Sequence, residues 1–207
     1  MPPLFDHFSQ MHGQSSDSTS HSLLQCVQQR DPDAWRRFAA LYGPIVYRWS
    51  IRYGLQPHDA ADVTQETFQS VAQSIDRFER RSADDSFRGW LWTITRNKIR
   101  DHFRRHQKEP RAAGGSAAHD QLQQTPSLPE KNDDSSEAVA TELAHRALRL
   151  IQSEFEPNTW RAFWATAVDA RRADEVAGEL GLTLAAVYKA KSRVLLRLRR
   201  ELEGLLD

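Results

Sequence analysis

The chain has 207 residues with 28 basic and 28 acidic side chains, so its formal net charge is zero. This length suits one large domain or two small ones, and the single cysteine, Cys26, excludes an internal disulfide and fits a reducing cytoplasm. No apolar run approaches the length of a membrane span. The total charge argues against a nucleic-acid partner, but the charges are segregated along the chain, and this local pattern outweighs the total.

The amino-terminal residues 1–21 are rich in Ser, Gln and His and have little apolar surface to bury. This composition is typical of a disordered tail. The segment also lacks the basic start and the apolar core of a secretory signal peptide, so we expect a cytoplasmic protein.

Helical periodicity begins after this tail. Asp31-Pro32 predicts an N-cap followed by proline at the first helical position, and apolar residues at helical spacing follow it. Gly43-Pro44 interrupts the pattern. It predicts that a second helix starts there and ends near Gly54.

A third helix is predicted from about Asp59. Its core face repeats at helical spacing in Ala60, Val63, Thr67, Val71 and Ile75. The opposite face repeats the same spacing in the polar residues Asp62, Gln65, Glu66 and Gln69. Such a polar stripe is usually a solvated face, and less often a surface for a partner.

A short polar loop, residues 79–86, precedes an aromatic run and then a basic helix. The cations of this helix are Arg96, Lys98, Arg100, Arg104 and Arg105. Aromatic residues beside a basic helix suggest nucleic-acid binding, because bases can stack while cations hold phosphates. The spacing of Trp90, Leu91 and Ile94 nevertheless indicates buried core positions.

Residues 107–136 contain three prolines and a Gly-Gly pair but few large apolar side chains, which predicts a flexible linker. Helical periodicity resumes over residues 137–207, and no segment shows sustained strand alternation. The sequence therefore predicts an all-α fold with two small helical domains, residues 22–106 and 137–207.

Residues 173–190 have the spacing of a helix-turn-helix. Ala177 lets the two helices approach, Gly181 supplies the turn, and the β-branched Val187 anchors the second helix. Residues 188–200 carry six cations and no acidic side chain. A helix of that charge suits the major groove of DNA, whereas the alternative is an ordinary helical hairpin with a solvated basic face.

The sequence gives no indication of an enzyme. It shows no nucleophile with a base, no glycine-rich phosphate loop, and no Cys/His cluster at zinc spacing. His102 and His106 lie one turn apart on the basic helix. Two ligands without a nearby third make a poor metal site, so we interpret both as surface residues and expect neither a metal nor a cofactor.

The motifs together resemble the extracytoplasmic-function (ECF) sigma factors, the small group of the sigma-70 family. The resemblance to region 2 rests on Trp90-Leu91, Ile94, Asn97, Asp101 and Arg104-Arg105, on Asp62-Val63-x-Gln65-Glu66-x-Phe68, and on Asp31-Pro32-Asp33-Ala34-Trp35. The helix-turn-helix resembles region 4 through Glu175-Val176-Ala177, Leu180-Gly181-Leu182 and Ser192-Arg193. The order and separation of these motifs are highly specific.

This resemblance implies a promoter-specificity subunit of bacterial RNA polymerase, whose region 2 binds the polymerase clamp and opens the −10 element. The implied contacts with core polymerase are Asp59, Asp62, Gln65, Glu66 and Gln69. The loop at residues 79–86 corresponds to the segment that captures a flipped base. The implied −10 contacts are Arg80, Arg81, Ser82, Asp84, Ser86, Arg88, Asn97, Arg100, Arg104 and Arg105.

Region 4 of the family reads the −35 element, and the implied contacts are Thr183, Tyr188, Lys189, Ser192, Arg193 and Arg197. The resemblance also implies promoter DNA as a partner, and an anti-sigma factor as in many relatives. Ala170 and Arg172 depart from the family pattern, which has a glycine and a helix-capping serine at these positions. The alternative is a helix-turn-helix repressor or activator that binds DNA alone, but this alternative leaves the polar stripe unexplained.

Overall fold

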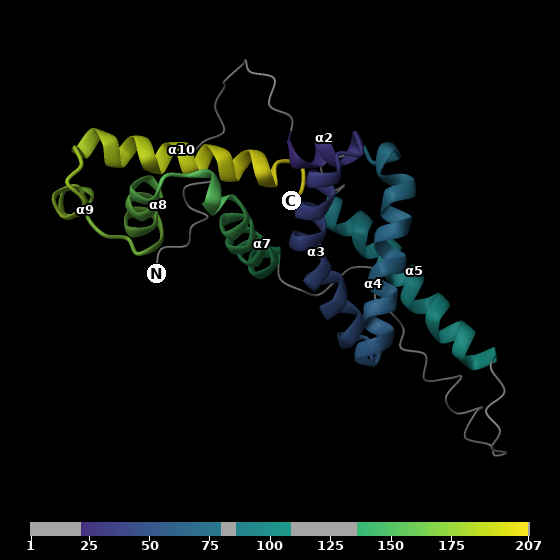
Figure 1. The fold of residues 1–207 in the computed structure, drawn as a ribbon. Helices are drawn as coiled ribbons and strands as arrows, with labels where there is room; N and C mark the ends of the chain where they lie inside the picture. Colours follow the sequence, from purple (N-terminus) through teal and green to yellow (C-terminus); the bar gives the residue numbers. More distant parts are fainter. Residues whose placement is uncertain (1–21, 80–85, 109–135, 207) are drawn as a thin grey trace. The chain divides into compact units, whose positions relative to one another are not determined.

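The computed structural model of the protein describes residues 22–79, 86–108 and 136–206 (Figure 1). These ranges are helical with short connections and contain no strand, which confirms the predicted all-α fold. Several predicted features lie outside them: the tail, most of the linker, and the loop residues Arg80, Arg81, Ser82 and Asp84. No helix in the described ranges is long and apolar enough to cross a membrane.

The described residues form two compact units. One unit takes residues 27–79, 86–108 and 205–206, and we call it the α3–α5 unit after its main helices. The other takes residues 22–26 and 136–204, and we call it the α7–α10 unit. The helices are α2 (Leu23–Gln28), α3 (Pro32–Arg52), α4 (Pro57–Ser74), α5 (Phe87–Lys108), α7 (Ser136–Ile151), α8 (Pro157–Phe163), α9 (Ala173–Leu180) and α10 (Leu184–Leu202). Short helical turns η1 (Ile75–Arg77), η2 (Gln152–Glu154) and η3 (Trp164–Val168) complete them.

Helix α3 begins where the sequence predicts. The Asp31 carboxylate accepts a hydrogen bond from the backbone N–H of Ala34 at 2.7 Å, and Pro32 occupies the first turn. These two residues satisfy or remove backbone donors that a helix start would otherwise leave unpaired.

The predicted break at Gly43-Pro44 is wrong, because α3 continues without interruption through Pro44. A proline inside a helix removes one backbone hydrogen bond and costs roughly 3 kcal/mol. Here the flanking side chains Tyr42 and Ile45 are completely buried, together with Leu41 and Val46. Their burial stabilises the continuous helix by more than the proline costs.

Aromatic rings hold α3, α4 and α5 together. Phe38 of α3 is completely buried and contacts Phe68 of α4 and Phe87 of α5, with ring centroids 5.4 and 5.6 Å apart. Trp49 of α3 packs against Trp92 of α5 with centroids 5.4 Å apart. All three helices therefore share one core, and each helix contacts the other two (Figure 1).

Two sequence predictions concern this core. The predicted core face of α4 is buried along its whole length, from Ala60 to Ile75, which confirms it. In α5 the prediction is confirmed for Leu91, whereas Trp90 and Ile94 are only half-buried. Trp92, which follows Leu91 in the chain, is buried together with it.

The helix-turn-helix has the predicted turn. Gly181 adopts a left-handed conformation with φ 64° and ends α9. Val176 and Ala177 of α9 pack with Val187 and Ala190 of α10 in a buried cluster. Helix α10 also contacts α7 and α8, so its apolar side is covered along its length (Figure 1).

The turn before α9 contains a strained backbone conformation at Ala170, the position where the family pattern has a glycine. Ala170 has φ 54°, a left-handed conformation that costs an L-residue about 1 kcal/mol and glycine almost nothing. We expect Ala170→Gly to raise the free energy of unfolding by about 1 kcal/mol, measured by urea denaturation of the full chain.

The matched control is Ala140→Gly, which lies in α7 at ordinary helical geometry. It should lower the free energy of unfolding by about 1 kcal/mol, because glycine is a poor helix former. If the two substitutions changed stability in the same direction, the conformation at Ala170 would not be the cause.

Candidate functional site

Helix α4 presents a polar face to solvent. We call Asp62, Gln65, Glu66 and Gln69 the α4 stripe. Asp62, Gln65 and Gln69 are exposed, on the side of the helix opposite the buried Val63. Because α4 is anchored between α3 and α5, the stripe is held on a rigid support. Asp62 also lies 3.4 Å from His58 on the same helix, and such an exposed pair is weak.

Two predicted polymerase contacts also connect α4 to α5. The Glu66 carboxylate accepts hydrogen bonds from Arg105 at 2.9 and 3.0 Å, and both side chains are partly exposed. The Asp59 carboxylate lies 3.7 Å from His102 Nε2. Burial lowers the pKa of His102, and the neighbouring His106 lowers it further. The charge of Asp59 partly offsets these two effects. Both carboxylates therefore face α5 as well as solvent, and that of Glu66 links the two helices through Arg105.

Helix α5 presents an exposed face that carries three of the predicted −10 contacts. Asn97, Arg100 and Arg104 are exposed and recur at i, i+3 and i+7, so they lie on one side of the helix. Arg104 also binds Asp101 at 2.8 Å, an exposed pair. This arrangement offers an amide and two guanidinium groups to a phosphate backbone or a base edge.

Of the remaining described −10 residues, Arg105 lies near the end of α5 and binds Glu66, whereas Ser86 and Arg88 lie at its start. Ser86 Oγ accepts a hydrogen bond from the backbone N–H of Gly89 at 2.9 Å, so this side chain caps the helix. Arg88 is half-buried in the first turn. Ser86 therefore helps to start α5, the helix that carries the basic face in its later turns.

Helix α10 presents the predicted −35 surface. We call Tyr188, Lys189, Ser192 and Arg193 the α10 face. All four are exposed, and Tyr188 keeps 56% of its surface accessible. Val187 is buried, as its predicted role as the anchor requires, and Val194 and Leu198 are buried with it, whereas Leu195 is half-buried.

Two predicted −35 contacts have structural partners instead of lying on this face. Thr183 is the N-cap of α10, and its hydroxyl accepts from the Ala186 N–H at 3.1 Å. Arg197 donates two hydrogen bonds to Glu154, each at 2.7 Å, and one to Glu201 at 2.8 Å. The Glu201 side chain is almost completely buried, so Arg197 provides the charge that this carboxylate needs.

We expect Arg193→Ala and Arg197→Ala to act differently. Arg193→Ala should weaken DNA binding by about 1–3 kcal/mol and leave the unfolding free energy unchanged, since Arg193 is exposed. Arg197→Ala should lower the unfolding free energy by about 2 kcal/mol, because it removes the ion pair with the buried Glu201 carboxylate and two hydrogen bonds to Glu154. Urea denaturation followed by circular dichroism measures both variants, and equal stabilities would contradict this division.

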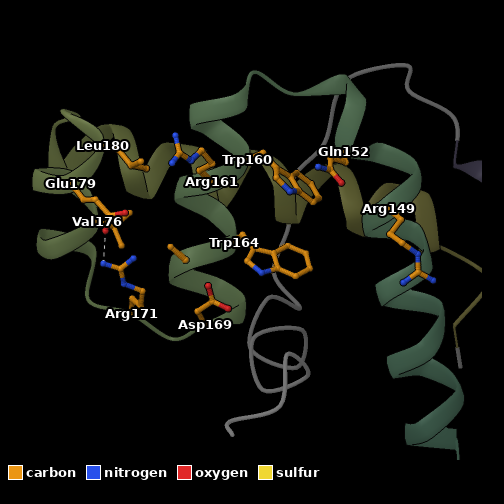
Figure 2. A pocket seen from close by; sticks show the side chains of 11 residues that line it. Arg149, Gln152, Trp160, Arg161, Trp164, Asp169, Arg171, Val176, Glu179 and Leu180 are labelled. Carbon is orange, nitrogen blue, oxygen red and sulfur yellow. Dashed lines mark hydrogen bonds and ion pairs between the residues drawn. The ribbon is translucent and has the colours of Figure 1, made fainter.

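The α7–α10 unit also contains a pocket of about 450 Å³ (Figure 2). Trp160 and Trp164 form part of its wall, and their ring centroids lie 5.8 Å apart. Arg171 and Glu179 form an ion pair at 2.6 Å on another side. None of the predicted site residues within the described ranges lines this pocket.

Residues 38–109 match the family described as sigma-70 region 2. The ECF RNA polymerase sigma factor SigE of Mycolicibacterium smegmatis is 36% identical over 72 residues, which cover 35% of this chain and 26% of SigE. The ECF RNA polymerase sigma factor SigC of Mycobacterium tuberculosis is 42% identical over 102 residues, 49% of this chain and 53% of SigC. This chain thus spans about a quarter of one relative and about half of the other.

The RNA polymerase sigma factor CnrH of Cupriavidus metallidurans is 28% identical over 175 residues, which cover 84% of this chain and 87% of CnrH. A solved structure of CnrH in complex with the cytosolic domain of CnrY aligns with 85% of this chain and 92% of that chain, at 24% identity and a TM-score of 0.35.

The family match covers residues 38–109, whose described part lies within the α3–α5 unit. This segment is similar to sigma-70 region 2, and it includes the α4 stripe and the exposed face of α5. SigE and SigC, the relatives most similar in sequence among those named, are both ECF sigma factors.

Proposed function

We propose that the protein is a sigma factor that binds bacterial core RNA polymerase and directs it to promoters. The observation that carries this proposal is the exposed α4 stripe on a rigid three-helix unit that matches sigma-70 region 2. A polar face that contacts only solvent can occur in any helical protein, so the match to sigma-70 region 2 favours a binding surface. A surface that binds the polymerase clamp requires exposed polar side chains on a support that moves little on binding.

The two basic surfaces divide the recognition of the promoter. Asn97, Arg100 and Arg104 on α5 would contact the −10 element. The α10 face would contact the −35 element, with Tyr188 and Arg193 at its exposed centre. Thr183 and Arg197 position α10 in this scheme, because their side chains are engaged within the α7–α10 unit.

This function makes the protein a regulator of another enzyme and not a catalyst itself. It would act by binding core polymerase and by opening promoter DNA. Opening includes base flipping, which costs a few kcal/mol for each flipped base. It would act in the cytoplasm, where bacterial RNA polymerase and promoter DNA meet.

The test is reconstitution with purified core polymerase. Fluorescently labelled protein is titrated with core, and the assembled enzyme then transcribes fragmented genomic DNA of the source organism, so that no promoter has to be assumed. We expect tight core binding and start sites that share two upstream elements. An unrelated basic protein of similar size serves as the control.

A gel-shift measurement without polymerase separates the alternative. A repressor or activator that acts alone shifts duplex DNA unaided, whereas a sigma factor requires core. Binding to core no tighter than the basic control, together with an unaided duplex shift, would replace the proposed function by the repressor reading.

A further inference from the structure

Three potential metal ligands meet where the first turn of α4 packs against the last turns of α5. They are Asp59, His102 and His106, and their ligand atoms all lie within 4.8 Å of one another. The interpretation of both histidines as surface residues rests on the premise that no third ligand lies nearby. That premise is wrong, since the packing of α4 on α5 supplies the Asp59 carboxylate.

The two histidines are arranged as ligands usually are. They lie one turn apart on the same side of α5, with ring centroids 4.1 Å apart. His106 Nδ1 lies 3.0 Å from the backbone oxygen of His102. A hydrogen bond donated there fixes the tautomer and leaves the Nε2 lone pair of His106 for an ion, which is the usual second contact of a metal-binding histidine.

The charges around the cluster favour a cation. Asp59 contributes a carboxylate 3.7 Å from His102 Nε2. Arg105, whose positive charge acts on His102, is bound by Glu66 at 2.9 Å, and this carboxylate offsets its charge. His102 is buried, so its interpretation as a surface residue is wrong, whereas His106 is exposed and Asp59 is partly exposed, which gives an ion a path of entry.

We propose that Asp59, His102 and His106 bind a divalent transition-metal ion of the zinc class, with water completing the coordination. Two imidazoles and one carboxylate are a common ligand set for such an ion. Bonds of about 2.0–2.1 Å place neighbouring ligand atoms about 3.3 Å apart in a tetrahedral site. The ligand atoms have to approach one another to reach that spacing, which requires the side chains of Asp59 and His106 to move toward the ion.

The ion would connect α4 to α5. Because Asp59 is also a predicted polymerase contact, the site lies at the edge of that surface. The proposal itself does not depend on the proposed function, since it rests only on the three side chains and their contacts.

The test titrates full-length, untagged, metal-free protein with Zn²⁺ by isothermal calorimetry, and with Co²⁺ followed by visible absorption. We expect one ion per chain at this site and a Co²⁺ spectrum typical of four-coordinate geometry. His106→Ala and Asp59→Asn should each weaken binding about tenfold or more. Both substitutions are at solvent-accessible positions, and circular dichroism verifies that the helices are retained.

The matched control is His58→Ala. His58 precedes Asp59 on α4 and lies beside Asp62, outside the cluster. It should leave Zn²⁺ affinity unchanged, and Zn²⁺ should raise the thermal unfolding midpoint of this variant and of the wild type but not that of His106→Ala. Equal Zn²⁺ affinity for wild type and His106→Ala would overturn the proposal, as would an equal loss in His58→Ala.

Discussion

Reversing two charges of the α4 stripe, with Asp62→Lys and Glu66→Lys, is expected to weaken binding to core polymerase about a hundredfold or more. Like charges brought together across an interface cost several kcal/mol. Asp62 is exposed, and its contact with His58 is weak, so its replacement leaves the core of the α3–α5 unit intact. Competition with labelled wild-type protein for core measures the loss.

The two positions have to be separated, because Glu66 also binds Arg105. Asp62→Lys alone tests the surface without disturbing that pair. Asp33→Lys is the matched control, since it makes the same charge change at an exposed position in the first turn of α3. An unchanged affinity of the double variant for core would show that the α4 stripe is a solvated face and not a polymerase contact.

Phe38→Ala is expected to lower the free energy of unfolding by about 3–5 kcal/mol. Phe38 is completely buried, and its ring contacts aromatic rings from α3, α4 and α5. Removing the ring therefore opens a cavity at the point where the three helices meet. Urea denaturation of the full chain, followed by tryptophan fluorescence, measures the change.

Two variants serve as controls for this prediction. Phe38→Leu retains much of the buried volume and should cost less than half as much. Tyr47→Ala removes an aromatic ring of α3 that is 37% exposed, and its cost should stay near 1 kcal/mol. A similar loss in Tyr47→Ala and Phe38→Ala would show that the shared aromatic core does not dominate the stability of this unit.

Local periodicity was sufficient to predict the all-α fold, the core face of α4 and the turn at Gly181. These features depend on residues within two or three helical turns of one another. The predicted break at Gly43-Pro44 was wrong for the opposite reason. The local cost of Pro44 is real, but the burial of Tyr42 and Ile45 against other helices outweighs it, and this burial is invisible in the local pattern.

The same distinction separates the candidate sites. The exposed faces of α4 and α10 follow from periodicity, so the sequence places their residues correctly on the surface. The contacts of Arg197 with Glu154 and of Asp59 with His102 join residues far apart in the chain. Only the contact with Glu201, four positions after Arg197, offered a sequence signal that this cation has a structural partner.

The pair between Glu66 and Arg105 links two surfaces that bind different molecules in the proposed function. A partner that draws the Glu66 carboxylate into its own contacts releases the Arg105 guanidinium on the neighbouring basic helix. Arg105 can then bind a phosphate with no competing carboxylate. Thermodynamic linkage makes this effect reciprocal, so a nucleic acid that takes Arg105 would strengthen the hold of the first partner on Glu66 by the same factor. The exchange involves one exposed pair, so this cooperativity is small, of the order of 1 kcal/mol.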